Sequence, residues 1–237
     1  MRVLAWDFGD RFDRFLSSLS IAELPMRWDF MRDHPRWRAR MGLHGRAEID
    51  DGFIGIWLKD DMSPEVAEET AAHELYHLEM VHQGFAYASV RDGQPTETWT
   101  DVATALSSYP SDIVVDSSLM SFGYTQESFR DPLYQDTCTS LSGASPETDL
   151  LTSVARNALG FYYVCRTITG PRLVNMLDLY QNKAPLAARV GAQLMLRSQG
   201  FDLRDCDQYL RVLLTFRDVL QLAPYLAVSD PRTGSLL

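Results

Sequence analysis

The chain has 237 residues, of which 46% are hydrophobic, and a formal net charge of -10. This length and composition suit one good-sized globular domain, or one domain with a helical extension. The acidic balance argues against nucleic acid as the main partner, because a phosphate backbone attracts basic surfaces. No apolar run approaches the roughly 18 residues that span a membrane, and Asp7 comes too early for a signal peptide.

The three cysteines, Cys138, Cys165 and Cys206, lie far apart in the sequence. Their number is odd, and their spacing matches neither a disulfide framework nor a zinc finger. We therefore expect reduced thiols and a cytoplasmic protein with no membrane segment.

The N-terminal third combines a helix with a β-hairpin. Residues 8–19 place Phe12, Phe15 and Leu19 on one side of a short amphipathic helix. Residues 47–49 and 53–58 read as strands around a turn at Asp50-Asp51-Gly52. Because an exposed edge strand can pair with an extended peptide, residues 53–58 are either a substrate-binding edge or a core strand. The sequence does not distinguish the two.

An arginine-rich segment precedes the hairpin. It contains six arginines with interleaved aromatic residues: Arg27, Trp28, Phe30, Arg32, Arg36, Trp37, Arg38, Arg40 and Arg46. Arginine with tryptophan is typical of a surface that binds a protein partner. The alternative, which we favour, is a solvated face whose arginines pair with acidic residues of the same chain.

Residues 64–83 read as a helix that carries the main functional motif. Ser63 is a suitable N-cap, Pro64 fits the first helical position, and Gly84 is a suitable stop. Inside this helix lies His73-Glu74-Leu75-Tyr76-His77, a His-Glu-x-x-His sequence.

This motif predicts a zinc site with a general base beside it. Histidines four apart lie about 40° apart around a helix, so both rings can reach one Zn²⁺ at roughly 2.0–2.1 Å. Glu74, rotated by about 100° from His73, can flank the ion and accept a proton from a metal-bound water. His82 is about 140° from His77 and cannot share the ion while the helix is continuous.

A catalytic zinc site needs a third protein ligand. Glu97 lies twenty residues after His77, and Asp101 lies one helical turn further on. With this spacing, residues 54–101 resemble the thermolysin-like gluzincins, and loosely the ImmA/IrrE-type intracellular peptidases. The resemblance implies that Glu97 is the third ligand and that the Asp101 carboxylate accepts the outer N–H of His73. Thr96 stands where the family often has Asn. Judged by spacing alone, other acids stay open as the third ligand: Asp92, Asp101, Asp112 and Asp116.

The rest of the chain reads as helical. We expect helices from Glu97 to Ser108, ended by Pro110, and from Ser111 towards Gly123. Residues 136–148 read as a loop and a domain boundary. Further helices are expected at about 149–168, 171–182, 185–199 and 203–222. This predicts a zinc-peptidase core over 1–135 and a helical part over 149–237, which can also form one continuous domain.

Together, the sequence predicts an α+β, mostly helical fold: a small N-terminal sheet, a zinc-binding helix pair and a helical C-terminal half. The expected function is zinc-dependent hydrolysis of peptide bonds in an intracellular protein or peptide. The alternatives are a zinc-stabilised regulatory or interaction protein with a protein partner, and a hydrolase of a non-peptide amide. C-terminal candidates for stabilising a transition state are Tyr162, Tyr163, Arg166 and Tyr180, although each is more typical of a core or rim position.

Overall fold

The computed structural model describes residues 1–34, 44–50, 52–125, 127–143 and 151–237. It is 61% helical and 15% strand, which confirms the mostly helical α+β class. The chain divides into two compact units. Met1–Gln83 and Val115–Ser128 form the first unit, and Gly84–Val114 and Phe129–Leu237 form the second. Among the described residues, no helix is long and apolar enough to cross a membrane.

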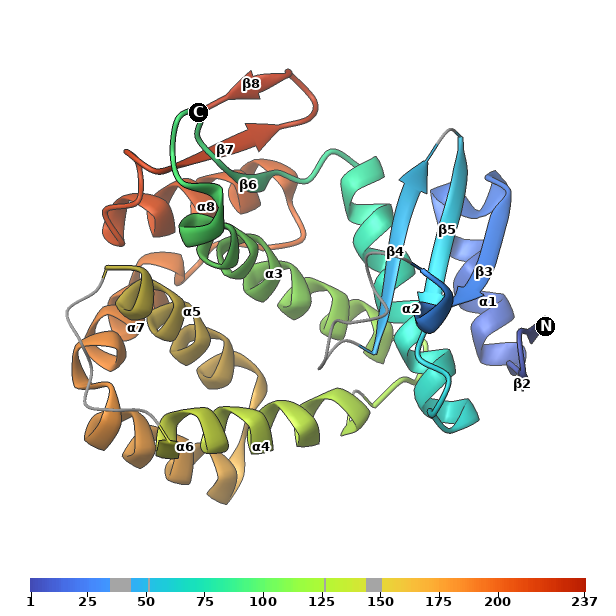
Figure 1. Ribbon diagram of the computed structural model, residues 1–237, viewed down its shortest axis with the longest axis horizontal. Helices are drawn as coiled ribbons and strands as arrows, with labels where there is room; N and C mark the ends of the chain where they lie inside the picture. Colours follow the sequence, from blue (N-terminus) through green and yellow to red (C-terminus); the bar gives the residue numbers. More distant parts are fainter. Residues whose placement is uncertain (35–43, 51, 126, 144–150) are drawn as a thin grey trace. The chain divides into compact units, whose positions relative to one another are not determined.

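The first unit is built around a three-stranded sheet and a long helix (Figure 1). Its elements are β1 (Arg2–Val3), β2 (Trp6–Asp7), α1 (Asp10–Ser18), β3 (Met26–Phe30), β4 (Gly45–Asp50), β5 (Phe53–Leu58) and α2 (Pro64–His82), with short 3-10 turns at Ser20–Glu23 and Met31–Asp33. The sheet order is β3-β5-β4, in which β3 is parallel and β4 antiparallel to β5. The expected hairpin is confirmed, because Ile49 pairs with Ile54 across it.

Apolar side chains from the sheet and from α2 make the core of this unit. Ile54, Ile56 and Leu58 alternate along β5 and are fully buried, as side chains on one face of a strand must alternate. Leu75 on α2 and Phe15 on α1 are also fully buried. Helix α2 packs on β4 and β5, so the helix that carries the histidine motif rests on the sheet.

Strand β5 is not a substrate-binding edge. It lies in the middle of the sheet and pairs with β3 on one side and β4 on the other. Both rows of its backbone hydrogen-bonding groups are therefore occupied, and the core-strand interpretation is correct. The neighbouring strand Met26–Phe30 was not predicted, although apolar and polar residues alternate along it, because most of these residues fall in the arginine-rich segment, which reads as a connection. Among the described strands of this sheet, β3 and β4 form the edges.

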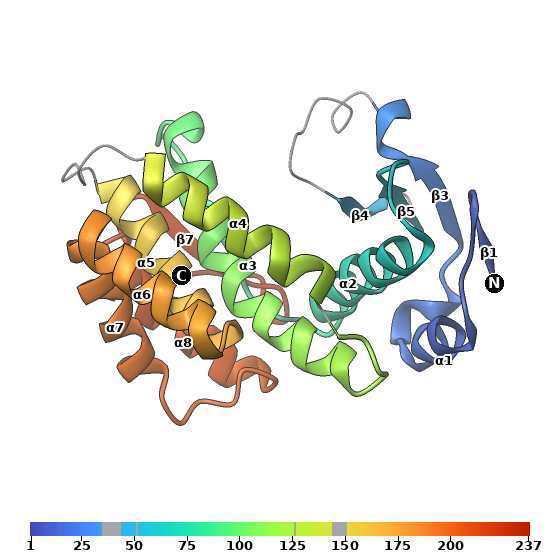
Figure 2. The ribbon, with the colours of Figure 1, turned by 90° about the horizontal axis from the view of Figure 1, so that it is seen from below.

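The second unit is mainly helical (Figure 2). Its elements are β6 (Tyr87–Val90), α3 (Thr96–Met120) as far as Val114, α4 (Glu127–Gly143) from Phe129, α5 (Leu151–Thr167), α6 (Gly170–Lys183), α7 (Pro185–Ser198), α8 (Cys206–Val219), β7 (Leu226–Asp230) and β8 (Ser235–Leu236). The last four predicted helices are confirmed. Two other expectations are wrong: residues 136–143 belong to α4 rather than to a loop, and the chain ends in strands. Strand β7 pairs with β6 and β8 in a small antiparallel sheet.

Helices α5 and α7 approach each other closely at Gly191. A Cβ at this position would lie 2.6 Å from Cδ1 of Phe161 and 2.8 Å from the carbonyl oxygen of Ala158. Real Cβ atoms essentially never come so close, so glycine is required for this pair of helices to pack.

Helix α3 is continuous through Pro110, which corrects the predicted break between Ser108 and Ser111. Proline in a helix removes one backbone hydrogen bond and costs about 3 kcal/mol. Buried side chains on both sides of Pro110 offset this cost: Leu106 before it and Val115 and Leu119 after it are fully buried. Tertiary packing therefore holds one long helix where local preference predicts two.

The described part of the arginine-rich segment is paired with acidic residues. Arg27 contacts Asp29 at 2.7 Å, and Arg32 pairs with Asp60. Arg46 lies 3.9 Å from a third acid, Glu48. Residues 35–43, with Arg36, Trp37, Arg38 and Arg40, lie outside the described residues. The visible pairs support the interpretation of a solvated face.

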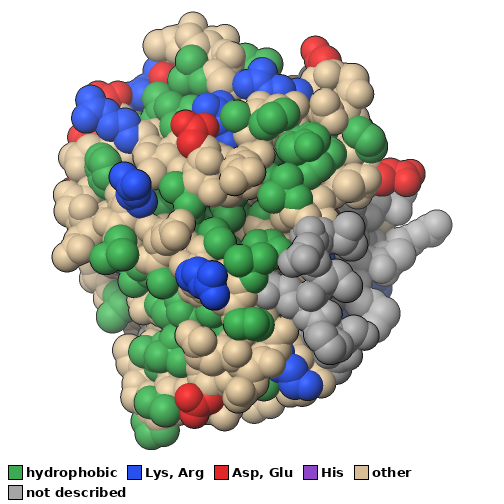
Figure 3. All heavy atoms as spheres, turned by 90° about the vertical axis from the view of Figure 1, so that its left-hand side faces the viewer, with side chains coloured by type: hydrophobic (Ala, Val, Ile, Leu, Met, Phe, Trp, Pro, Cys, Tyr) green, Lys and Arg blue, Asp and Glu red, His purple; other side chains and the backbone are tan. Residues whose placement is uncertain are grey.

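The surface drawn in Figure 3 shows no extended patch of one kind. Hydrophobic side chains lie in small groups, separated by polar atoms and by single Lys, Arg or acidic side chains. Scattered apolar groups of this kind are normal on soluble proteins, so this face does not indicate a docking surface.

All three cysteines are free thiols.

Candidate metal centre

Helix α2 starts as its sequence predicts. The Ser63 hydroxyl accepts a hydrogen bond from the Val66 N–H at 3.4 Å, and Pro64 occupies the first turn. Both features satisfy or remove backbone donors that have no partner in a helix's first turn. The helix ends at His82, one residue before the expected end.

Two buried glutamates hold α2 on either side of the histidine motif. Glu68 accepts hydrogen bonds from the Gly9 N–H and the Arg11 guanidinium, both at 2.9 Å. Glu79 accepts from the Ser20 hydroxyl at 2.6 Å and from the Ile21 N–H at 3.2 Å. Buried charges of this kind are stable only when they are paired or hydrogen-bonded. These contacts fix the helix that lies between them, and with it the two histidines.

The rings of His73 and His77 lie side by side on α2. Their Nε2 atoms are 3.0 Å apart, and the ring centroids are 4.7 Å apart with an interplanar angle of 73°. Two nitrogens bound at 2.0–2.1 Å to one tetrahedral ion would lie about 3.3 Å apart. The pair is thus nearly in the arrangement that a shared metal ion requires, and both side chains are half-buried.

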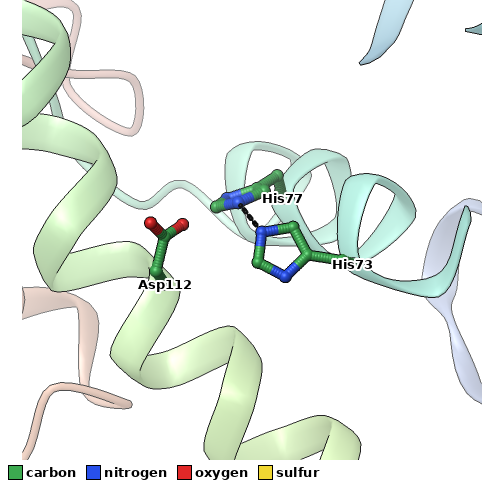
Figure 4. Close-up of side chains that lie close together, drawn as sticks. All are labelled: His73, His77 and Asp112. Carbon is green, nitrogen blue, oxygen red and sulfur yellow. Dashed lines mark hydrogen bonds between the residues drawn. The ribbon is translucent and has the colours of Figure 1, made fainter. Parts of the chain in front are cut away.

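One acidic side chain joins this pair. His73, His77 and Asp112 each offer a ligand atom, and the three atoms lie within 4.8 Å of one another (Figure 4). In the described part of the chain this is the one group of His, Cys, Asp or Glu side chains that could hold a metal ion. Asp112 lies on α3, three residues before Val115, where this unbroken helix passes into the first unit. Two imidazoles and a carboxylate fit the donors that Zn²⁺ prefers.

Glu97 and Asp101 are not in this group. Both are exposed in the N-terminal part of α3, and the Asp101 carboxylate lies 4.0 Å from the Arg156 guanidinium. At 1.5 Å per residue, they precede Asp112 by about 22 Å and 16 Å along the helix axis. Because α3 is continuous, neither can bind the same ion as Asp112. The geometry therefore favours Asp112, which the sequence left open as an alternative, and the assignment of Glu97 stays a prediction.

The remaining acids and His82 take other positions. Glu74 is half-buried next to His73, and Asp92 and His82 are exposed. Asp116 is 5% exposed, one turn after Asp112 on α3. Glu97 was preferred to Asp112 because of its spacing from His77 and the gluzincin resemblance, and the apolar positions beyond Pro110 were the signal that the helix continues to Asp112 and past it.

The C-terminal tyrosines named from the sequence are core residues. Tyr162 is fully buried against Phe216, with ring centroids 4.8 Å apart. Tyr180 is 2% exposed, and Tyr163 stacks on Tyr109 at 5.2 Å. Burial raises the pKa of Tyr162 and Tyr180 above the ordinary value for tyrosine. The fourth candidate, Arg166, is exposed on α5.

Comparisons of this chain with protein-family models, with curated proteins and with solved structures find no match.

Proposed function

We propose that this protein is a zinc-dependent metallopeptidase in which His73, His77 and Asp112 hold the ion and Glu74 transfers the proton. One observation carries the proposal: two imidazole Nε2 atoms 3.0 Å apart on a helix, with a carboxylate oxygen within 4.8 Å. Three protein ligands leave a fourth position open, as catalytic zinc sites require.

The donor set and Glu74 support zinc hydrolysis over other metal chemistry. Two histidines with one carboxylate also suit iron(II), but an iron site has no need of a glutamate beside the first histidine. When bound, zinc supplies a Lewis acid that polarises a carbonyl and makes a bound water more acidic. Glu74 follows His73 directly and is half-buried. It is not one of the three proposed ligands, so its carboxylate can act as the base.

In this proposal Glu74 holds and moves one proton. Its carboxylate accepts the proton of the attacking water and then delivers it to the nitrogen of the leaving amine. His73 and His77 keep their positions throughout, because α2 is anchored at Glu68 and Glu79.

The substrate would pair with β4 rather than with β5. Strand β4 lies at an edge of the described sheet, and it packs against α2. Its outer row of backbone groups offers an extended peptide the hydrogen bonds of an added strand. An intracellular protein or peptide in an extended conformation is thus the proposed substrate class, with the cytoplasm as the proposed compartment.

The proposal is tested by metal content and by cleavage of an unstructured protein such as β-casein. We expect about one zinc per chain, loss of zinc in the His73→Ala/His77→Ala double variant, and cleavage that stops on addition of 1,10-phenanthroline. Fragments identified by mass spectrometry would show whether peptide bonds are the target. Full zinc occupancy in the double variant, or cleavage that resists the chelator, would contradict the proposal.

A further inference from the structure

The second unit contains a cavity of about 300 Å³ that the proposed metal centre does not use. Its lining residues come from helices α3, α4, α5 and α6, and all of them belong to this unit. Figures 1 and 2 label these four helices. A volume of this size is at the lower end of the range for small-molecule sites, roughly 300–1,000 Å³.

Tyrosines and a glycine form one side of the cavity. Tyr109 and Tyr163 stack with an interplanar angle of 10°, and Tyr180 is 2% exposed. A Cβ at Gly160 would lie 3.0 Å from the Tyr180 hydroxyl and 4.0 Å from Cε2 of Tyr109. Gly160 therefore keeps open a space that any larger residue would narrow.

Two opposite charges also line the cavity, on different helices. Asp136 comes from α4 and Arg156 from α5, and both are exposed. Within the described residues, no ion pair of 4.0 Å or less joins them. Arg156 has only a long contact with Asp101, at 4.0 Å, and Asp136 has no hydrogen-bond or ion-pair partner among the residues that the structure describes.

This arrangement suits a ligand that carries both charges itself. Two opposite charges that line one small cavity without pairing with each other leave the guanidinium for a carboxylate and the carboxylate for an ammonium group. The amide of Asn157 adds a hydrogen-bond donor and acceptor beside Arg156, and Leu141 and Val164 provide apolar contacts.

We infer that this cavity binds a small zwitterion with an apolar side chain, namely a free α-amino acid or a dipeptide. Arg156 binds the carboxylate, Asp136 binds the ammonium group, and the side chain lies against Leu141, Val164 and the tyrosines. The inference does not depend on the peptidase proposal, because none of the lining residues is a proposed ligand or base.

The test is calorimetric titration of the full-length protein with L-phenylalanine and with glycyl-L-phenylalanine, which distinguishes the free amino acid from the dipeptide. Titrations with N-acetyl-L-phenylalanine and L-phenylalaninamide each remove one ligand charge. We expect saturable binding of at least one zwitterion, and affinity at least about tenfold weaker for either charge-deleted analogue.

The protein side of the test uses Arg156→Gln, Asp136→Asn and Gly160→Ala. Each variant should weaken zwitterion binding by about tenfold or more, the first two by removing a charge and the third by narrowing the cavity. Arg166→Gln on α5 and Asp178→Asn on α6 are matched controls, because both residues are exposed and neither lines the cavity. Circular dichroism confirms that each variant is folded.

Three results would overturn the inference. The first is the absence of saturable binding for both zwitterions. The second is equal binding of the charge-deleted analogues. The third is an equal loss of affinity in the control variants, because binding would then not depend on Asp136 and Arg156.

Discussion

Replacing Asp112 or Glu97 by alanine separates the two candidate third ligands of the metal centre. A structural zinc site, which has four protein ligands, contributes about 10–16 kcal/mol. One ligand therefore accounts for roughly 3–4 kcal/mol, or about a hundred- to thousandfold in Kd. If Asp112 is the ligand, Asp112→Ala weakens zinc binding by this factor. Glu97→Ala then leaves the zinc affinity unchanged, because Glu97 lies about 22 Å from Asp112, towards the N-terminus of the same helix.

Competition with a chromophoric zinc indicator measures both dissociation constants. Asp101→Ala is the internal standard: a carboxylate behind a ligating histidine would cost about 10–100-fold, whereas the Asp112 assignment predicts no change. Asp112 is not the third ligand if Glu97→Ala loses zinc while Asp112→Ala binds it as the wild type does. That outcome would restore the ligand set implied by the gluzincin resemblance and would require α3 to lie differently from the present structure.

Three further predictions concern the anchored helix. Glu74→Gln should keep zinc and fold but lose at least about 10²–10⁴-fold in turnover, because the proton acceptor is removed; undiminished cleavage by this variant would exclude the mechanism. Glu79→Ala should lower the free energy of unfolding in urea by about 2–4 kcal/mol, since it leaves the Ser20 hydroxyl and the Ile21 N–H without their partner, and a change below about 0.5 kcal/mol would show that Glu79 does not anchor α2. Removing the metal with a chelator should lower Tm reversibly, because a ligand that binds only the folded state stabilises it; an unchanged Tm would mean that no tightly bound ion is present.

The local features of the motif helix could be predicted from the sequence. Its start at Ser63 and Pro64 follows from capping chemistry, and the spacing of His73 and His77 places both rings on one side of any α-helix. The β4–β5 hairpin and the four C-terminal helices follow from equally local signals. These predictions need only the preferences of residues close together in the chain, which hold in nearly any fold.

The tertiary structure decided what depends on distant residues. Proline predicts a break at Pro110, but side chains buried on both sides keep α3 one continuous helix, and this changes which acid can reach the histidines. The pairing of β3 with β5 decided that β5 is a core strand, and the meeting of four helices placed Asp136 and Arg156 on one cavity. Packing and strand pairing join residues far apart in the chain, and their free energies exceed local preferences of a few kcal/mol, so no local pattern reveals them.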